Sequence, residues 1–277
     1  ALFSGISRGT EALVFAARVP ASQYAVMRAP FQVGEFPAPV KYGYACVGIV
    51  EDGERTGQVV FCLHPHQDRF VVPADAAHPL PDDLPPQRAV LAANMETALT
   101  GLWDADAPPG TRLAVIGAGT VGCLVAYLAE RQHDGPVELI DIDPGKAAVA
   151  EALGVAFATL DAAAADCGTV IHASGNPAGL VAALGLAAFE GTIVEMSWYG
   201  DTAVALPLGE AFHSRRLTIK SSQVGAVAPL RRAQWSHRRR LGEALSPLRD
   251  DALDVLISGA SSFAHLPRTH SVAPPPS

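Results

Sequence analysis

The sequence predicts an α/β protein in which a doubly wound parallel sheet follows a smaller β-rich domain. From about Gly101, short apolar runs alternate with helical patterns, which is typical of a parallel sheet covered by helices. Before about residue 98, short β-branched runs separated by Pro and Gly indicate strands with few helices. The chain has 277 residues, 49% of them apolar and only 17% charged, which is enough for two domains with compact cores. We predict a β-rich domain over 1–98, a sheet domain over 99–226, and a basic helix and return segment with a Pro-rich tail over 227–277.

The β-rich part contains three runs that favour strands. They are Val47–Val50, Val59–Cys62 and Phe70–Val72, and turn residues separate them. A Pro-rich connector starting at residue 79 follows, and Gln87–Trp103 then carries apolar residues at helical spacing.

A glycine turn opens the sheet domain. A buried strand ends at residue 116, and Gly117-Ala-Gly119-Thr120-Val121-Gly122 leads into an apolar helix. Gly117 permits a tight turn, Gly119 lets the backbone approach a pyrophosphate, and Gly122 lets the helix pack closely on the strand. Thr120 and Val121 lie in the first helical turn, whose free N–H groups face the phosphates. The run 113–129 is at the short limit for a membrane span, and we interpret it as strand, turn and helix.

An acidic residue stands at the position that selects the cofactor. Asp141 ends the second predicted strand, 19 residues after Gly122. A carboxylate there accepts both ribose hydroxyls of an adenosine and repels a 2′-phosphate, so the sequence favours NAD over NADP. One alternative is a Gly-rich turn packed in a core. A methyltransferase is another, but its turn carries an acid just before the glycines, where this chain has Ile116.

The remaining elements complete the predicted sheet. They are a helix over 146–153 that Gly154 ends, strands over 169–173, 192–196 and 217–220, and a helix over 180–189. Ligands of doubly wound sheets bind at the carboxyl ends of the strands. We therefore expect Ser174, Gly175, Trp198, Tyr199 and Gln223 near the redox end of a dinucleotide, the alternative for each being an ordinary loop residue.

Charge is distributed unevenly. The formal net charge is −8, so we expect no nucleic-acid and no membrane partner. Residues 212–242 nevertheless hold eight Arg or Lys and no acid, leaving 12 basic and 28 acidic residues elsewhere. We interpret this segment as a solvated face that pairs with the acidic remainder, with an anionic substrate as the alternative. Four scattered cysteines fit free thiols in a reducing cytoplasm.

Four strings occur in the order found in one known family. They are Ser4–Glu11, Lys41–Glu51, Val71–Asp75 and the glycine turn, and their order resembles the medium-chain dehydrogenase/reductase superfamily, which is zinc-type alcohol dehydrogenase-like. The resemblance covers roughly Phe3 to Phe263, and Ser4–Glu11 also resembles the branch of bacteriochlorophyllide-type dehydrogenases. It implies a Rossmann domain beside a partial GroES-like β-domain, with an active site between them. It also implies a small-molecule substrate, a cytoplasmic enzyme and a homo-oligomer.

The chain departs from this family at the zinc ligands. The resemblance places Ser7, Tyr44 and Ala93 at or near the positions of the three ligands, and a hydroxyl, a phenol and a methyl group do not hold zinc in the usual way. We therefore expect no catalytic zinc. A second metal cluster, Cys62-Leu-His64-Pro-His66, is disfavoured because Pro65 interrupts the strand. The family's first strands and its closing strand are also missing, so we expect either a partial chain or a degraded relative.

Without zinc, the substrate oxygen needs a proton donor. Tyr44 is the preferred candidate because the resemblance puts it where a metal ligand faces the cleft, and Ser7 and Glu96 are weaker ones. Thr97 lies where the family's helix approaches the nicotinamide. The predicted function is an NAD(P)-dependent oxidoreductase that transfers hydride between nicotinamide and an alcohol or carbonyl substrate. The alternatives are a zinc-free enone or quinone reductase and a nucleotide-binding protein without catalysis.

Overall fold

The computed structural model describes residues 1–266, which form two compact units. The first unit comprises residues 1–93, 200–202 and the part from 241 onward, and the second comprises 94–199 and 203–240. The boundary between the units falls between residues 93 and 94, whereas the sequence predicts it near residue 98. The basic residues 227–240 belong to the second unit. The predicted Pro-rich tail from residue 267 lies outside the described residues.

The first unit is built on a small antiparallel sheet with strand order β1-β4-β5-β6. Its elements are β1 (Phe3–Ser4), α1 (Arg8–Phe15), β2 (Val33–Gly34), β3 (Val40–Lys41), β4 (Cys46–Ile49), β5 (Val59–Cys62) and β6 (His78–Pro79). Strands β4 and β5 pair along their whole length, and their paired residues Val47 and Phe61 are fully buried. The two strands predicted over 47–50 and 59–62 are confirmed, whereas the one over 70–72 is wrong. Phe70 instead stacks its ring on the His64 ring, with centroids 3.6 Å apart.

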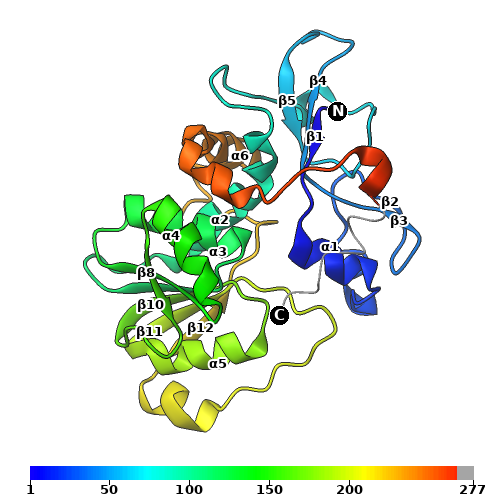
Figure 1. Ribbon diagram of the computed structural model, residues 1–277. Helices are drawn as coiled ribbons and strands as arrows, with labels where there is room; N and C mark the ends of the chain where they lie inside the picture. The colour runs from blue at the N-terminus through cyan, green and yellow to red at the C-terminus, as the bar shows by residue number, and fades with distance from the viewer. Residues whose placement is uncertain (267–277) are drawn as a thin grey trace. The chain divides into compact units, whose positions relative to one another are not determined.

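The second unit is a parallel sheet with strand order β12-β11-β10-β7-β8-β9, as the predicted doubly wound fold requires (Figure 1). Its strands are β7 (Leu113–Ile116), β8 (Val137–Asp141), β9 (Ala156–Thr159), β10 (Cys167–His172), β11 (Ala187–Glu195) and β12 (Thr218–Ser221). Its helices are α3 (Thr120–Gln132), α4 (Ala147–Leu153) and α5 (Pro177–Leu186), together with most of α2 (Ala92–Ala105). The chain reverses its winding direction between β7 and β10, which are neighbours in the sheet.

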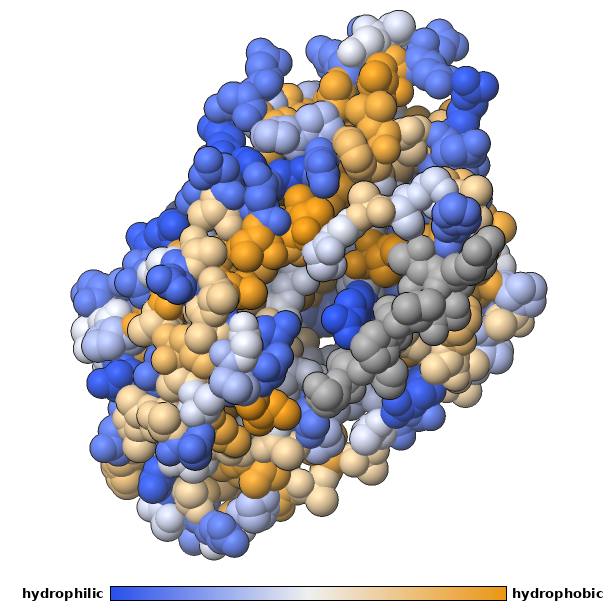
Figure 2. All heavy atoms as spheres, viewed as in Figure 1, coloured by the Kyte–Doolittle hydropathy of each residue, from blue (hydrophilic) through white to orange (hydrophobic). Residues whose placement is uncertain are grey.

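Buried apolar residues explain why these elements form. All four residues of β7 are buried, and α3 is buried from Gly122 through Ala129, so the run 113–129 is strand, turn and helix as predicted. No helix among residues 1–266 is long and apolar enough to cross a membrane. On the face shown in Figure 2, hydrophobic residues lie among hydrophilic ones over the second unit.

Two local predictions in the sheet domain need correction. The helix expected to reach residue 189 ends at Leu186, because Ala187 already pairs with Cys167 as the first residue of β11. Strand β9 was not predicted; it pairs with β8 at the edge of the sheet. Sheet pairing overrides the weak local propensity of such Ala-rich segments. Gly154 ends α4 in the left-handed conformation (φ 70°), as expected.

The basic segment of the second unit is held by aromatic rings and carbonyl groups. Trp103 and Trp235 have ring centroids 4.8 Å apart, with Arg231 over the first ring and Arg239 over the second. Arg240 differs from the other arginines of this segment because it is buried, and it is the last residue of α6 (His237–Leu245) that belongs to the second unit. Two arginines of the predicted basic segment 212–242 pair with acids, Arg216 with Glu190 and Arg240 with Glu96.

Candidate functional site

The turn after β7 is shaped for close contact on one side and open space on the other. Gly117 has a φ of 104°, and a Cβ placed on it would lie 2.6 Å from the Ser174 Cα. A Cβ on Gly122 would lie 1.8 Å from the Gly117 carbonyl oxygen, so α3 packs directly on the turn. Around Gly119 a Cβ would meet nothing within 4 Å. The helix α3 also has no side-chain cap, so its first N–H groups are available to an anion.

The carboxylate of Asp141 lies at this turn. Its Oδ2 accepts a hydrogen bond from the Ala118 N–H (2.6 Å), and its Oδ1 accepts one from the Asp143 N–H (2.9 Å). The acid therefore stands between the glycine turn and the loop after β8. This is where the ribose of a dinucleotide lies when its diphosphate sits on the turn.

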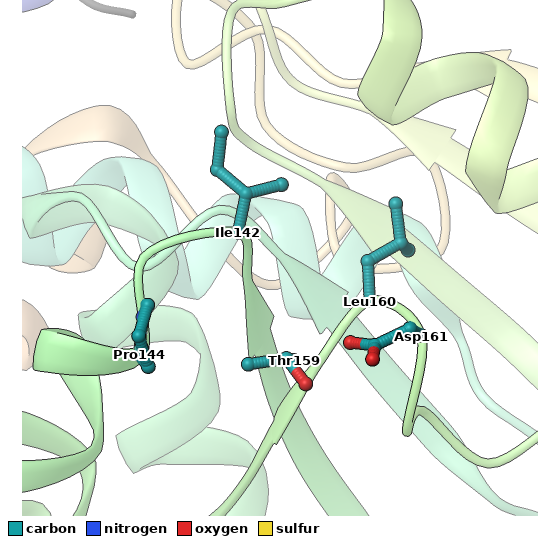
Figure 3. A pocket seen from close by; sticks show the side chains of 5 residues that line it. All are labelled: Ile142, Pro144, Thr159, Leu160 and Asp161. Atoms are coloured by element: carbon teal, nitrogen blue, oxygen red, sulfur yellow. The ribbon is translucent and has the colours of Figure 1, made fainter.

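An open cavity of about 590 Å³ adjoins the carboxyl ends of β8 and β9. Figure 3 shows Ile142 and Pro144 on one side of it, Leu160 and Asp161 on the other, and Thr159 between them. The apolar side chains of this open depression suit the face of a flat heterocycle such as adenine. The cavity, Asp141 and the glycine turn follow one another along the same edge of the sheet. The residues present therefore fit the adenosine diphosphate part of a dinucleotide.

A buried histidine lies beyond the turn, at the carboxyl end of β10. The His172 side chain is fully buried, with Nδ1 2.7 Å from Glu195 Oε2 and Nε2 2.6 Å from Ser174 Oγ. Tyr199 donates its hydroxyl to Glu195 Oε2 (2.9 Å), and the Ser197 N–H donates to Oε1 (2.6 Å). Burial, together with the nearby Glu195 carboxylate, raises the pKa of Tyr199, so its phenol stays a donor at neutral pH.

Sequence reasoning missed the two central members of this cluster. Ser174 and Tyr199 were expected at the strand ends, and Gly175 N–H also reaches the cluster through Ser197 Oγ (3.1 Å). His172 and Glu195 were not expected, because each lies in a run taken for a buried apolar strand. The sequence did contain a signal for them, because the apolar strands β10 and β11 each end in a polar residue.

Two further predicted site residues lie on α2. Glu96 is buried and forms an ion pair with Arg240, whose Nε is 3.0 Å from Glu96 Oε1. Burial raises the pKa of Glu96, and the Arg240 charge opposes that shift. Arg240 also donates to the carbonyls of Val224 and Ala226. The pair thus holds the loop after β12, and Thr97 lies half-buried on the next position of the helix.

In the first unit, the structure brings Tyr44 and Ser7 together. The Tyr44 side chain lies beside the hydroxyls of Ser7 and Thr10. Burial is the main cause of a raised Tyr44 pKa; the Ser7 and Thr10 hydroxyls lower it, and the Glu11 carboxylate raises it further. Ser7 is the N-cap of α1, and Glu11 Oε1 accepts its N–H (2.7 Å). Tyr44 is therefore a neutral phenol next to two hydroxyls.

His66, which the sequence did not single out by itself, lies next to these residues with a largely buried side chain. His66 Nε2 is 2.8 Å from Glu11 Oε2, and its Nδ1 is 2.6 Å from Ser4 Oγ. A Cβ on Gly43 would lie 3.0 Å from the His66 ring, so the glycine before Tyr44 makes room for this side chain. The Glu11–His66 pair joins α1 to the loop after β5.

The donor chemistry of the first unit does not fit a catalytic zinc of the family type. Ser7 and Tyr44 offer a hydroxyl and a phenol, and Ala93 is a buried apolar residue. In the second metal cluster that the sequence offers, Cys62-Leu-His64-Pro-His66, the His64 ring stacks on the Phe70 ring. The His64 Nδ1 is hydrogen-bonded with the Pro65 carbonyl oxygen (2.9 Å). Within residues 1–266, no group of three or more His, Cys, Asp and Glu side chains is arranged to hold a metal ion.

Solved structures of dehydrogenases share this architecture. Galactitol-1-phosphate dehydrogenase from Escherichia coli superposes with a TM-score of 0.71 at 15% identity, covering 98% of this chain and 87% of its own. Alcohol dehydrogenase TADH from Thermus sp. ATN1 gives 0.67 at 20% identity, with 97% and 86% covered. The short chain alcohol dehydrogenase rspB from Escherichia coli CFT073, complexed with NADH, gives 0.67 at 18% identity, with 83% and 79% covered.

The chain has the fold of these dehydrogenases. The α/β fold class, with its doubly wound sheet, is confirmed. No protein-family model matches the sequence, and no curated protein matches it. The likeness therefore rests on the three-dimensional arrangement, and it does not identify a substrate.

Proposed function

We propose that the protein is an oxidoreductase that binds NAD and transfers hydride between the nicotinamide and an alcohol or carbonyl substrate. One observation carries the proposal. The open glycine turn, the Asp141 carboxylate and the apolar cavity lie in sequence along the carboxyl edge of a sheet whose winding reverses between β7 and β10. The similar solved structures are dehydrogenases, one of them complexed with NADH, which supports the same chemistry.

The residues of the second unit would hold the cofactor in a defined way. The N–H groups of Gly119, Thr120 and Val121 would bind the diphosphate, and Asp141 would accept hydrogen bonds from the adenosine ribose hydroxyls. A 2′-phosphate would bring a second anion against Asp141, so NAD is preferred over NADP. The bound dinucleotide supplies the hydride acceptor or donor.

Tyr44 is the proposed proton donor to the substrate oxygen. Its raised pKa keeps the phenol protonated at neutral pH, so the hydroxyl can donate a hydrogen bond to the substrate oxygen and pass its proton to the alkoxide that forms there. Because Ser7, Tyr44 and Ala93 do not fit zinc, no step of the proposal involves a metal. The bacteriochlorophyllide-type branch, the homo-oligomer and the cytoplasmic location remain predictions.

The test begins with binding. NADH should bind in calorimetry, and ADP-ribose should compete with it, because the cavity and the turn recognise that half of the molecule. A panel of aldehydes, ketones, enones and quinones is then followed by the absorbance of the nicotinamide. Turnover of enones but not of carbonyls would favour the reductase of activated double bonds, and binding without any turnover would favour the non-catalytic protein. A chain that binds no NADH would refute the proposal.

A further inference from the structure

The His172 cluster has two complete hydrogen-bonding arrangements that differ by one proton. With a neutral ring, Nδ1–H donates to Glu195 and the Ser174 hydroxyl donates to Nε2. The Ser174 oxygen then accepts the Asn176 N–H (3.1 Å). With a protonated ring, Nε2–H donates to Ser174 Oγ, and the serine hydrogen must find another acceptor. Within the cluster only the Asn176 carbonyl is offered, at 3.5 Å, which is a weak hydrogen bond.

A protonated His172 would therefore leave the Ser174 hydroxyl hydrogen without a strong acceptor inside the cluster. The backbone and Cβ of Ser174 lie against the first glycine of the turn, since a Cβ on Gly117 would lie 2.6–2.9 Å from the Ser174 Cα, N and Cβ. A diphosphate on that turn is rich in acceptor oxygens and carries negative charge. It would accept the released hydroxyl hydrogen and would favour a cation behind it.

The electrostatic surroundings of His172 are simple. Facing it from β11 and the segment after it are the Glu195 carboxylate and the neutral Tyr199 phenol. On the other side, β7 and α5 contribute no titratable side chain, and α5 contacts the ring through Gly179. Asp141 lies across the glycine turn, where its carboxylate accepts the Ala118 N–H.

We propose that His172 is a positioning residue of the dinucleotide site, which takes up a proton when the dinucleotide binds and thereby directs the Ser174 hydroxyl at its diphosphate. The inference rests on the proposed function and adds to it a proton-linked contact. The proton comes from solvent and resides on Nε2, between Ser174 and the buried ring. Glu195 and Tyr199 hold the ring in place in both states.

The test is the pH dependence of NADH binding to the full chain. The NADH affinity of the wild-type protein should rise about tenfold from pH 8 to pH 6, because one additional hydrogen bond to a charged group contributes about that much to binding. At a fixed pH, the calorimetric enthalpy should differ between two buffers of unequal protonation enthalpy, which reports proton uptake. His172→Gln should remove both effects. Ser174→Ala, which keeps the histidine, should remove the rise in affinity, and Ser174→Thr should restore it.

Matched controls separate the possible outcomes. His213→Gln changes an exposed histidine of the same unit and should behave as the wild type. A merely structural role for His172 would weaken binding equally at every pH, which would overturn the inference, as would an unchanged pH dependence in Ser174→Ala. NADH binding with a pH-independent affinity and a buffer-independent enthalpy would overturn it while leaving the proposed function intact. An absence of NADH binding at any pH would overturn both.

Discussion

At the residue scale, Tyr44 combines a buried phenol with two hydroxyl partners. The hydroxyls of Ser7 and Thr10 lie beside it, and burial keeps it protonated. A phenol with a raised pKa is a weaker acid than an ordinary tyrosine, so it gives up its proton only to a stronger base, such as the alkoxide that forms when hydride reaches a carbonyl carbon. Because it is protonated at every pH below its pKa, the Tyr44-dependent step of carbonyl reduction should be insensitive to pH between about 6 and 9.

Tyr44→Phe removes this proton donor while keeping the ring. We expect carbonyl turnover to fall roughly 10²-fold or more, with the NADH affinity unchanged. Steady-state kinetics and NADH titration would measure the two effects. Tyr42→Phe is a matched control, because Tyr42 is the neighbouring ring in an edge-on contact with Tyr44. Equal losses in both variants would mean that packing, and not proton transfer, explains the effect.

Asp141 is expected to set the choice between the two dinucleotides. Asp141→Asn removes the charge but keeps an acceptor, so NADH binding should weaken by about tenfold and the preference over NADPH should shrink. Glu151→Gln makes the same charge change on the exposed side of α4 and should leave both affinities unchanged. Fluorescence titration with both cofactors gives the ratio. An unaltered ratio in Asp141→Asn would contradict this role.

At the scale of elements, the turn between β7 and α3 has two glycines with different tasks. The Gly122 Cβ would collide with the Gly117 carbonyl, whereas that of Gly119 would project into open space. Gly122→Ala should therefore destabilise the second unit by about 1–3 kcal/mol, because α3 must move away from the strand. Gly119→Ala should preserve stability and weaken NADH binding.

Urea unfolding and NADH titration of both variants separate packing from binding. Stability and affinity should fall together in Gly122→Ala, but only affinity should fall in Gly119→Ala. If Gly119→Ala bound NADH as the wild type does, the diphosphate would not lie on this turn. The spacing of these glycines was readable from the sequence because each position has its own steric requirement.

At the scale of the whole molecule, all four cysteines are free and buried. Burial raises the pKa of Cys46 and Cys167 to about 11, and that of Cys62 and Cys123 to about 12. Thiolate is therefore scarce in the folded protein at pH 8. On unfolding, the thiols return to their ordinary pKa of about 8.5 and become reactive.

Thiol labelling should accordingly report unfolding. At pH 8 we expect slow modification of the native chain by a thiol reagent and rapid modification of all four cysteines in denaturant. Mass spectrometry can follow Cys46 and Cys62 of the first unit separately from Cys123 and Cys167 of the second. Fast labelling of any one of them under native conditions would contradict its burial. Labelling in two successive pairs would show that the units unfold independently.

The sequence by itself determined the parallel sheet, the glycine turn and the acid at its edge. These depend on local rules: the length of an apolar run, the conformations open to glycine, and a fixed spacing along one strand–helix–strand unit. Asp141 could therefore be placed from a count of residues, and its contact with the Ala118 N–H agrees with that placement. The limits of β9 and β11 could not be read in this way, because pairing with neighbouring strands decides them.

Only the tertiary structure decided which buried polar groups meet. His172 and Glu195 are 23 residues apart, and Glu11 and His66 are 55 apart. Parallel pairing of β10 with β11 aligns the first pair, and the packing of α1 against the loop after β5 aligns the second. A buried polar side chain requires a partner, but the sequence does not say which one, because the partner is supplied by strands and helices that are distant along the chain.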